Sequence, residues 1–170
     1  MSTVVNHETA GAGAALTGEV VWRELAKASF AVVSHVTPTG QPRSSGVVYT
    51  VVGRRMYVVV AADSWKARHI AASGRVAVTV PVRRGGIMSL LFPIPPATIS
   101  FHASAVVHPA DSLAGSPLAS RLGSLIPAER LTSSRVIEIV PKGEFVTYGV
   151  GVSLMQMRHP GLARGRAPAA

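Results

Sequence analysis

The sequence contains no cysteine. This absence excludes a disulfide framework, a thiolate metal site and a thiol nucleophile, and it fits a reducing cytoplasm. No apolar run reaches the length that a membrane-spanning helix needs. The N-terminal residues do not combine a basic region with a continuous apolar core, so they do not indicate a secretory signal. We therefore expect a cytoplasmic protein without stable membrane insertion.

Aromatic and acidic residues are also scarce. Aromatics make up 5% of the chain, and 8 acidic residues stand against 17 lysines and arginines, for a net charge of +9. Such a surface attracts anions, among them phosphorylated ligands, acidic lipids and nucleic acid. Basic and aromatic residues do not interleave as in a nucleic-acid stacking platform, so we expect no nucleic-acid partner. The acidic residues are too few to indicate a paired-carboxylate site, and His35 and His69 lack a metal-ligand spacing.

The 170 residues, of which 48% are hydrophobic, suit one domain with a real core. We expect a flexible leader over residues 1–16, a barrel domain over 17–152 and a basic C-terminal tail over 153–170. From Arg158 onward the composition predicts disorder or a segment draped on a neighbouring subunit.

The hydrophobic patterns predict helices over Thr17–Ala28, from Ser64 to about Ala72, and after Ser116. Strands are expected at Phe30–Val36, Arg43–Val52, Arg55–Ala61, Arg75–Val82, Thr98–Val107, Arg135–Val140 and Phe145–Val150. Short connections favour antiparallel pairing, and closure removes exposed strand edges. The predicted fold is mostly β: a six- to seven-stranded antiparallel barrel with a few helices.

The most informative stretch runs from Asp63 to His69, directly after a valine-rich strand. Ser64 and Lys66 fall at the predicted helix N-terminus, where free backbone N–H groups and the helix dipole attract anions. The chain has only two other lysines, Lys27 and Lys142. We interpret this corner as a phosphate site; the alternative is a helix cap beside a solvated lysine.

The chain resembles the pyridoxamine 5'-phosphate oxidase-like, or flavin-reductase-like, split barrels. The resemblance rests on the order and spacing of Thr37–Pro42 with Val47–Tyr49, Met56–Val60, Ser64–Arg68 and Val76–Val80. It implies a six-stranded split barrel, usually a homodimer, with FMN or the deazaflavin coenzyme F-420 in a groove at the dimer interface. The implied function is a flavin-dependent oxidoreductase that transfers hydride to or from a small apolar substrate. The alternative is a non-catalytic haem or lipid carrier on the same fold.

The resemblance also implies roles for individual residues. Ser64 and Lys66 would hold the cofactor phosphate, and the backbone of Ser45, Gly46, Val47 and Val48 would face the flavin ring. Arg43 would lie within reach of a phosphate; the alternative is an exposed side chain after the turn. Full pyridoxamine phosphate oxidases carry a basic residue where this chain has Ser45. The resemblance therefore points to the cofactor site rather than to that substrate.

Two further features allow more than one interpretation. His102, Ser100 and Ser104 alternate on one face of a predicted strand and would line either a polar pocket or a solvated surface. The apolar, proline-rich segment Ile87–Pro96 joins two strands. It suits burial against the barrel or a second subunit, a wall over a flavin, or a patch that touches a membrane.

Overall fold

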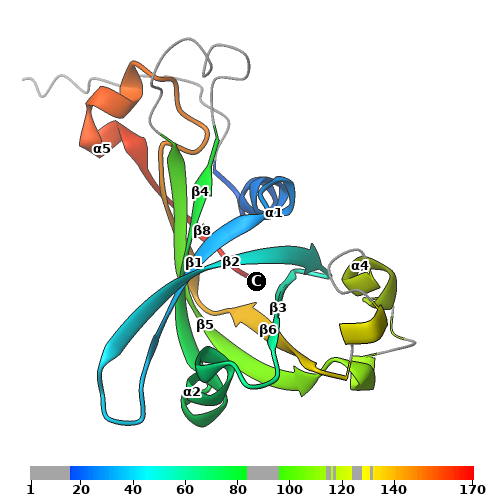
Figure 1. Cartoon of the computed structure of the whole chain (residues 1–170). Helices are drawn as coiled ribbons and strands as arrows, with labels where there is room; N and C mark the ends of the chain where they lie inside the picture. The colour runs from blue at the N-terminus through cyan, green and yellow to red at the C-terminus, as the bar shows by residue number, and fades with distance from the viewer. Residues whose placement is uncertain (1–15, 84–95, 114–115, 117, 124–127, 131) are drawn as a thin grey trace, which may run out of the picture.

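The computed structural model describes residues 16–83, 96–113, 116, 118–123, 128–130 and 132–170. Its centre is a closed antiparallel barrel in the order β4-β1-β2-β3-β6-β5, which the ladder between β4 and β5 closes (Figure 1). The strands are β1 (Phe30–Val36), β2 (Pro42–Val52), β3 (Arg55–Ala61), β4 (Arg75–Val82), β5 (Ala97–Pro109) and β6 (Ser134–Pro141). The predicted antiparallel barrel is confirmed, and β1, β3 and β4 have the predicted bounds.

Two more strands extend the barrel sheet at its side. β7 (Glu144–Tyr148) pairs with the first half of β5, and β8 (Arg164–Pro168) pairs with β7. The expectation of disorder from Arg158 onward is therefore wrong. The sequence of β8 has no strand pattern of its own, but the free edge of β7 supplies backbone partners. The indole nitrogen of Trp22 donates to the carbonyl oxygen of Ala169 at 3.2 Å, which holds the end of the chain on the core.

Helices cover the barrel at separate places. α1 (Gly18–Lys27) begins at Thr17, whose hydroxyl accepts a hydrogen bond from the Val20 N–H, and buries its apolar face on the barrel. α2 (Trp65–Ser73) packs against β1 and β5 at the lower end of the view in Figure 1, and ends at Gly74, whose φ of 63° is left-handed. The shorter elements are η1 (Asp111–Leu113), α4 (Ala119–Gly123), η2 (Ala128–Arg130), η3 (Gln156–Arg158) and α5 (Pro160–Ala163).

The helix predicted after Ser116 begins later, at Ala119, and residues 124–127 of that prediction lie outside the described residues. The same holds for the apolar segment Ile87–Pro96 except Pro96, and for residues 1–15 of the predicted leader. Within the described residues, no helix combines the length and apolar character needed to cross a bilayer.

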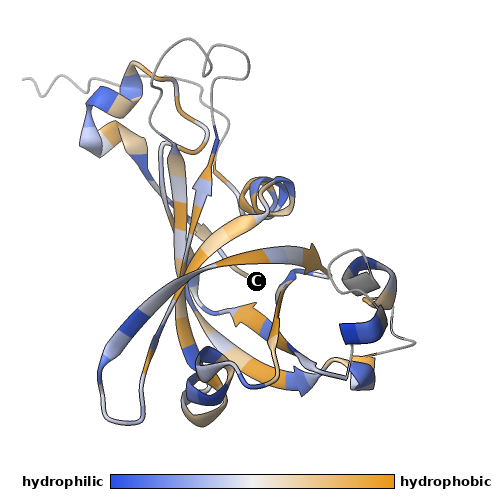
Figure 2. Cartoon of the chain, in the orientation of Figure 1, coloured by the Kyte–Doolittle hydropathy of each residue, from blue (hydrophilic) through white to orange (hydrophobic). Residues whose placement is uncertain are grey.

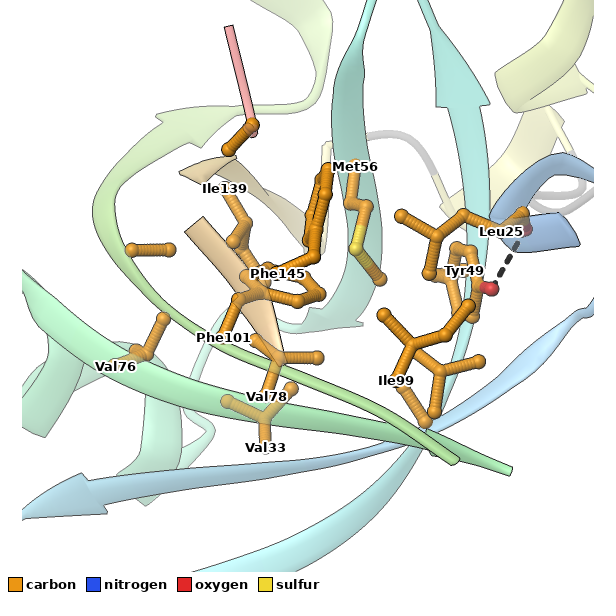
Figure 3. Packing of buried hydrophobic residues seen from close by; sticks show 14 of the residues in the cluster. Leu25, Val33, Tyr49, Met56, Val76, Val78, Ile99, Phe101, Ile139 and Phe145 are labelled. Carbon is orange, nitrogen blue, oxygen red and sulfur yellow. Dashed lines mark hydrogen bonds between the residues drawn. The ribbon is translucent and has the colours of Figure 1, made fainter. Parts of the chain in front are cut away.

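The core fills the barrel with alternating strand residues. Every second residue is buried along β4 from Val76 to Val82 and along β5 from Ala97 to Ala105, and hydrophobic colour follows the barrel strands in Figure 2. The ring of Phe145 packs edge-on against Phe101, with ring centroids 5.3 Å apart (Figure 3). It packs in the same way against Trp22, at 5.4 Å. The Tyr49 hydroxyl donates to the Leu25 carbonyl at 2.7 Å and ties α1 to β2. Burial raises the pKa of Tyr49 above its ordinary value.

The packing predicts that Phe145→Ala destabilises the protein by about 3–5 kcal/mol, because it removes a fully buried ring between two aromatic partners. Val146→Ala is a matched control on the same strand: its side chain is 45% exposed, so the change should stay within about 0.5 kcal/mol. Urea denaturation of both variants measures the difference. Equal losses would contradict this description of the core.

Candidate functional site

β2 is longer than its pairing with β3. It pairs with β1 from Pro42 to Val48, but with β3 only from Tyr49 to Val52. Residues 42–48 therefore have β1 on one side and, within the described part of the chain, no strand on the other. This segment of β2 contains the residues predicted to face a flavin ring.

The hydrogen-bond pattern shows where the backbone of this segment points. The Tyr49 N–H donates to the Ser29 carbonyl at 3.0 Å, on the β1 side. Because donors alternate between the two edges of an antiparallel strand, the N–H groups of Gly46 and Val48 point to the open edge. The open edge thus offers main-chain donors at two of the predicted positions.

α2 begins directly after β3. The carbonyl of Ser64 accepts the Arg68 N–H at 3.2 Å, which makes Ser64 the cap residue, but its side chain makes no capping hydrogen bond. The first-turn N–H groups and the partly buried side chains of Ser64 and Lys66 therefore lie at one helix end. A helix end with free N–H groups, a hydroxyl and an ammonium can attract an anion.

Two histidines and a tryptophan meet beneath this helix end. His35 of β1 is only 4% exposed, and its Nε2 lies 3.4 Å from Nδ1 of His69 on α2. The Trp65 ring lies 5.4 Å from the His35 ring and 5.7 Å from the His69 ring, measured between centroids. No local sequence pattern predicts this cluster, because His35 and His69 are 34 positions apart in the chain. Among the described residues, no group of three acidic, histidine or cysteine side chains is placed to hold a metal ion.

Positive charge gathers around His35. Its pKa is lowered from 6.5, first by burial and then by the charges of His69, Lys66 and Arg43. Arg43 is also the direct cross-strand partner of His35. The structure thus places Arg43, Lys66 and His69 within electrostatic reach of His35, although they come from β2 and α2. We call Arg43, Ser64, Lys66 and His69 the cationic corner.

Two buried polar atoms beside the cationic corner lack partners in the described structure: Nδ1 of His35 and Oγ of Ser45. A buried polar group without a hydrogen bond costs free energy, and native structures usually satisfy it. Ser45 and Arg43 alternate onto the same side of β2. A guanidinium, an ammonium and hydroxyl groups beside unpaired buried atoms fit a ligand that carries a phosphate.

The predicted ring-facing residues do not share one side of β2. The side chain of Val47 is 7% exposed and belongs to the core, so only its backbone is available to a ligand. Gly46 lies on the opposite side, where a Cβ atom would come within 2.8 Å of the Phe30 ring. A side chain at this position would require the exposed Phe30 ring to move. Val48, on the same outward side, is 56% exposed.

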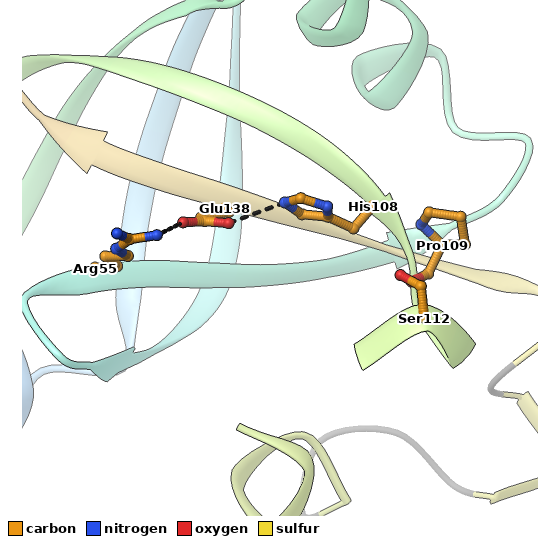
Figure 4. Close-up of polar contacts among 5 residues, drawn as sticks. All are labelled: Arg55, His108, Pro109, Ser112 and Glu138. Carbon is orange, nitrogen blue, oxygen red and sulfur yellow. Dashed lines mark hydrogen bonds and ion pairs between the residues drawn. The ribbon is translucent and has the colours of Figure 1, made fainter. Parts of the chain in front are cut away.

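A second polar cluster lies away from the cationic corner, on β3, β6 and β5. The Arg55 guanidinium and Nε2 of His108 both contact the Glu138 carboxylate, the latter at 2.9 Å (Figure 4). The three side chains satisfy one another across neighbouring strands. The cluster therefore serves to hold these strands together and leaves Glu138 fully engaged.

The chain matches no family model and no curated protein in sequence. Its structure is similar to a putative pyridoxamine 5'-phosphate oxidase from Listeria innocua, with TM-score 0.56, 16% identity and coverage of 74% of this chain and 93% of that one. An F420 reductase matches with TM-score 0.54, 17% identity and coverage of 72% and 93%. The haem storage protein HutZ from Vibrio cholerae matches with TM-score 0.60, 14% identity and coverage of 80% and 98%.

The chain has the split-barrel fold of these proteins. The resemblance found in the sequence motifs is confirmed at the level of the fold. The same fold serves flavin-related proteins and a haem storage protein, so the fold is compatible with both kinds of cofactor.

The lowered pKa of His35 predicts acid sensitivity. Because the unfolded chain binds this proton more readily than the folded one, stability should fall as the pH drops below about 6.5. His35→Phe keeps a ring in the aromatic cluster and should make the free energy of unfolding less dependent on pH between about 7 and 5. Urea denaturation at several pH values measures this slope. His102→Gln, which changes an exposed histidine, should keep the wild-type slope; a wild-type slope in His35→Phe would contradict the prediction.

Proposed function

We propose that the protein binds a flavin-type cofactor, FMN or the deazaflavin coenzyme F-420, at the open edge of β2 and the N-terminus of α2. We further propose that it acts as an oxidoreductase on a small substrate with an apolar body. The observation that carries the proposal is the cationic corner. It joins Arg43 and Lys66, from separate elements, beside the unpaired Oγ of Ser45.

In this proposal the chain's own residues bind and orient the cofactor. Lys66, Arg43 and Ser64 hold its phosphate, through charge-assisted hydrogen bonds and the first turn of α2. The N–H groups of Gly46 and Val48 hydrogen-bond the ring system from the open edge of β2. When bound, a flavin or deazaflavin supplies hydride transfer, which no protein side chain performs.

The phosphate chemistry supports both cofactors equally, because each carries a phosphate. The F420 reductase and the pyridoxamine 5'-phosphate oxidase-like protein among the structural neighbours support this class of cofactor. The haem storage protein among them favours the alternative, a non-catalytic carrier of haem or lipid. Native mass spectrometry of the protein incubated with FMN, F-420 or haem distinguishes these ligands by mass. A flavin absorption band supports the proposal; a Soret band in its place supports the alternative.

Lys66→Ala is expected to weaken FMN binding by about tenfold to a hundredfold, because it removes a charged hydrogen bond to the phosphate. Arg43→Ala should have a similar effect. Lys142→Ala is the matched control: this exposed lysine lies in the turn between β6 and β7 and should leave the affinity unchanged. Quenching of flavin fluorescence measures the dissociation constants. Unchanged affinity in Lys66→Ala would remove the basis of the proposed phosphate site.

We also propose a homodimer. Phe30, Val36 and Val48 share the outward side of β1 and β2, and their side chains are 47%, 47% and 56% exposed. Exposed apolar patches of this kind mark association surfaces, and a second copy would bury them. The patch adjoins the open edge of β2, so the partner would also shield the proposed cofactor from water.

Phe30→Asp is therefore expected to shift the protein from dimer to monomer, because it places a charge in the apolar patch. Val106→Asp is the matched control: Val106 is 54% exposed but faces outward from β5 opposite Glu138. Sedimentation velocity reports the subunit number of each. A monomeric wild-type protein would contradict the proposal, as would an equal effect of both substitutions.

A further inference from the structure

A polar groove of about 440 Å³ lies on β5, β7 and β8, and none of the residues of the cationic corner lines it. Its lining comes from Thr98 and Ser100 of β5, Val146–Tyr148 of β7 and Arg164–Arg166 of β8. The proposed cofactor site uses none of these residues. Of these residues, only Ser100 was predicted from the sequence as a residue that could line a polar pocket.

The strand register arranges the groove as two parallel rows. Thr98 faces Tyr148, which faces Arg164. Ser100 faces Val146, which faces Arg166. Cross-strand partners point to the same side of a sheet, so each row runs from a hydroxyl, over an apolar or aromatic side chain, to a guanidinium.

The charge of the groove is positive. No acidic side chain lines it. Within the described residues, Arg164 has no ion pair, and Arg166 pairs with Glu144 at 3.2 Å between side chains that are 72% and 54% exposed. Such an exposed pair is weak, and an anionic ligand can replace it. Two guanidiniums on one strand edge, separated by one residue, form a fork for a carboxylate or a phosphate.

Hydrogen bonds also fix side chains at two places in the groove, at Tyr148 and at Ser100. The Tyr148 hydroxyl donates to the Met157 carbonyl at 2.9 Å, which fixes the ring in place. Val146 beside it is 45% exposed. The Ser100 hydroxyl lies 3.1 Å from that of Thr79, so the hydroxyl end of the row is held by a hydrogen bond. A ligand would rest its apolar body on Val146 and Tyr148.

We infer that this groove binds a small organic acid, with its carboxylate or phosphate on Arg164 and Arg166 and its apolar body on β7. The groove opens on the outward side of the sheet that also carries Gly46 and Val48, with β1 and β4 between them. The binding of the acid does not rest on the proposed cofactor site.

The test is a calorimetric titration of the full chain, without added flavin, with benzoate, phenyl phosphate and uncharged benzamide. The wild-type protein should bind at least one of the two acids and bind benzamide at least tenfold more weakly, since benzamide lacks the charge that the guanidiniums recognise. Arg164→Ala should weaken acid binding by about tenfold, and Arg164→Lys by less, because it keeps the charge. Arg130→Ala, an exposed arginine of η2 outside the groove, is the matched control. Thermal unfolding verifies that each variant is folded.

Binding of benzoate alone identifies a carboxylate site, binding of phenyl phosphate alone a phosphate site, and binding of both a general organic-anion site; each supports the inference. Absence of acid binding at millimolar concentration overturns it, as does equal affinity of wild type and Arg164→Ala. Lys66→Ala should weaken FMN binding and leave acid binding unchanged, and Arg164→Ala should do the reverse. A failure of the groove and a failure of the cofactor site therefore give different results.

Discussion

The candidate site depends on the fact that the two neighbours of β2 pair with different parts of it. β1 accompanies β2 along Pro42–Val48, whereas β3 pairs only with Tyr49–Val52 and then leads into α2. The unpaired edge of β2 and the position of the α2 N-terminus both follow from the point where β3 separates from β2. The same separation also brings Lys66 toward Arg43. If β3 followed β2 to its end, the main-chain donors of Gly46 and Val48 would be used inside the sheet. The barrel would then be better paired and would offer no edge for a ring system.

Much of the fold follows from local patterns. The limits of β1, β3 and β4 and the helix that follows β3 were predicted from hydrophobic patterns, because burial of one face of a strand or helix leaves a periodic pattern in the sequence. β8 left no such mark. Its Arg-Gly-Arg-Ala-Pro sequence resembles a linker, and only the neighbouring edge of β7 makes it a strand.

Part of the candidate site could also be predicted, because some of its residues are close together in the sequence. Ser64 and Lys66 are neighbours in sequence and share one helix end, so the local pattern revealed them. The meeting of His35 with His69 depends on how α2 lies across β1, which no local pattern encodes. The groove is similar, since its rows combine residues from β5, β7 and β8. Long-range register, rather than residue type, was the missing information.

The position of β8 at the margin of the sheet has a consequence for self-association. A strand with one free side offers hydrogen-bonding groups that invite stacking of further chains, and proteins deter this with charge and proline. β8 carries Arg164, Arg166 and Pro168 at that margin. The two guanidiniums that line the groove therefore also keep neighbouring molecules from adding strands. Hydrophobic substitutions at these positions would lower the solubility of the protein and would also change which ligands the groove prefers.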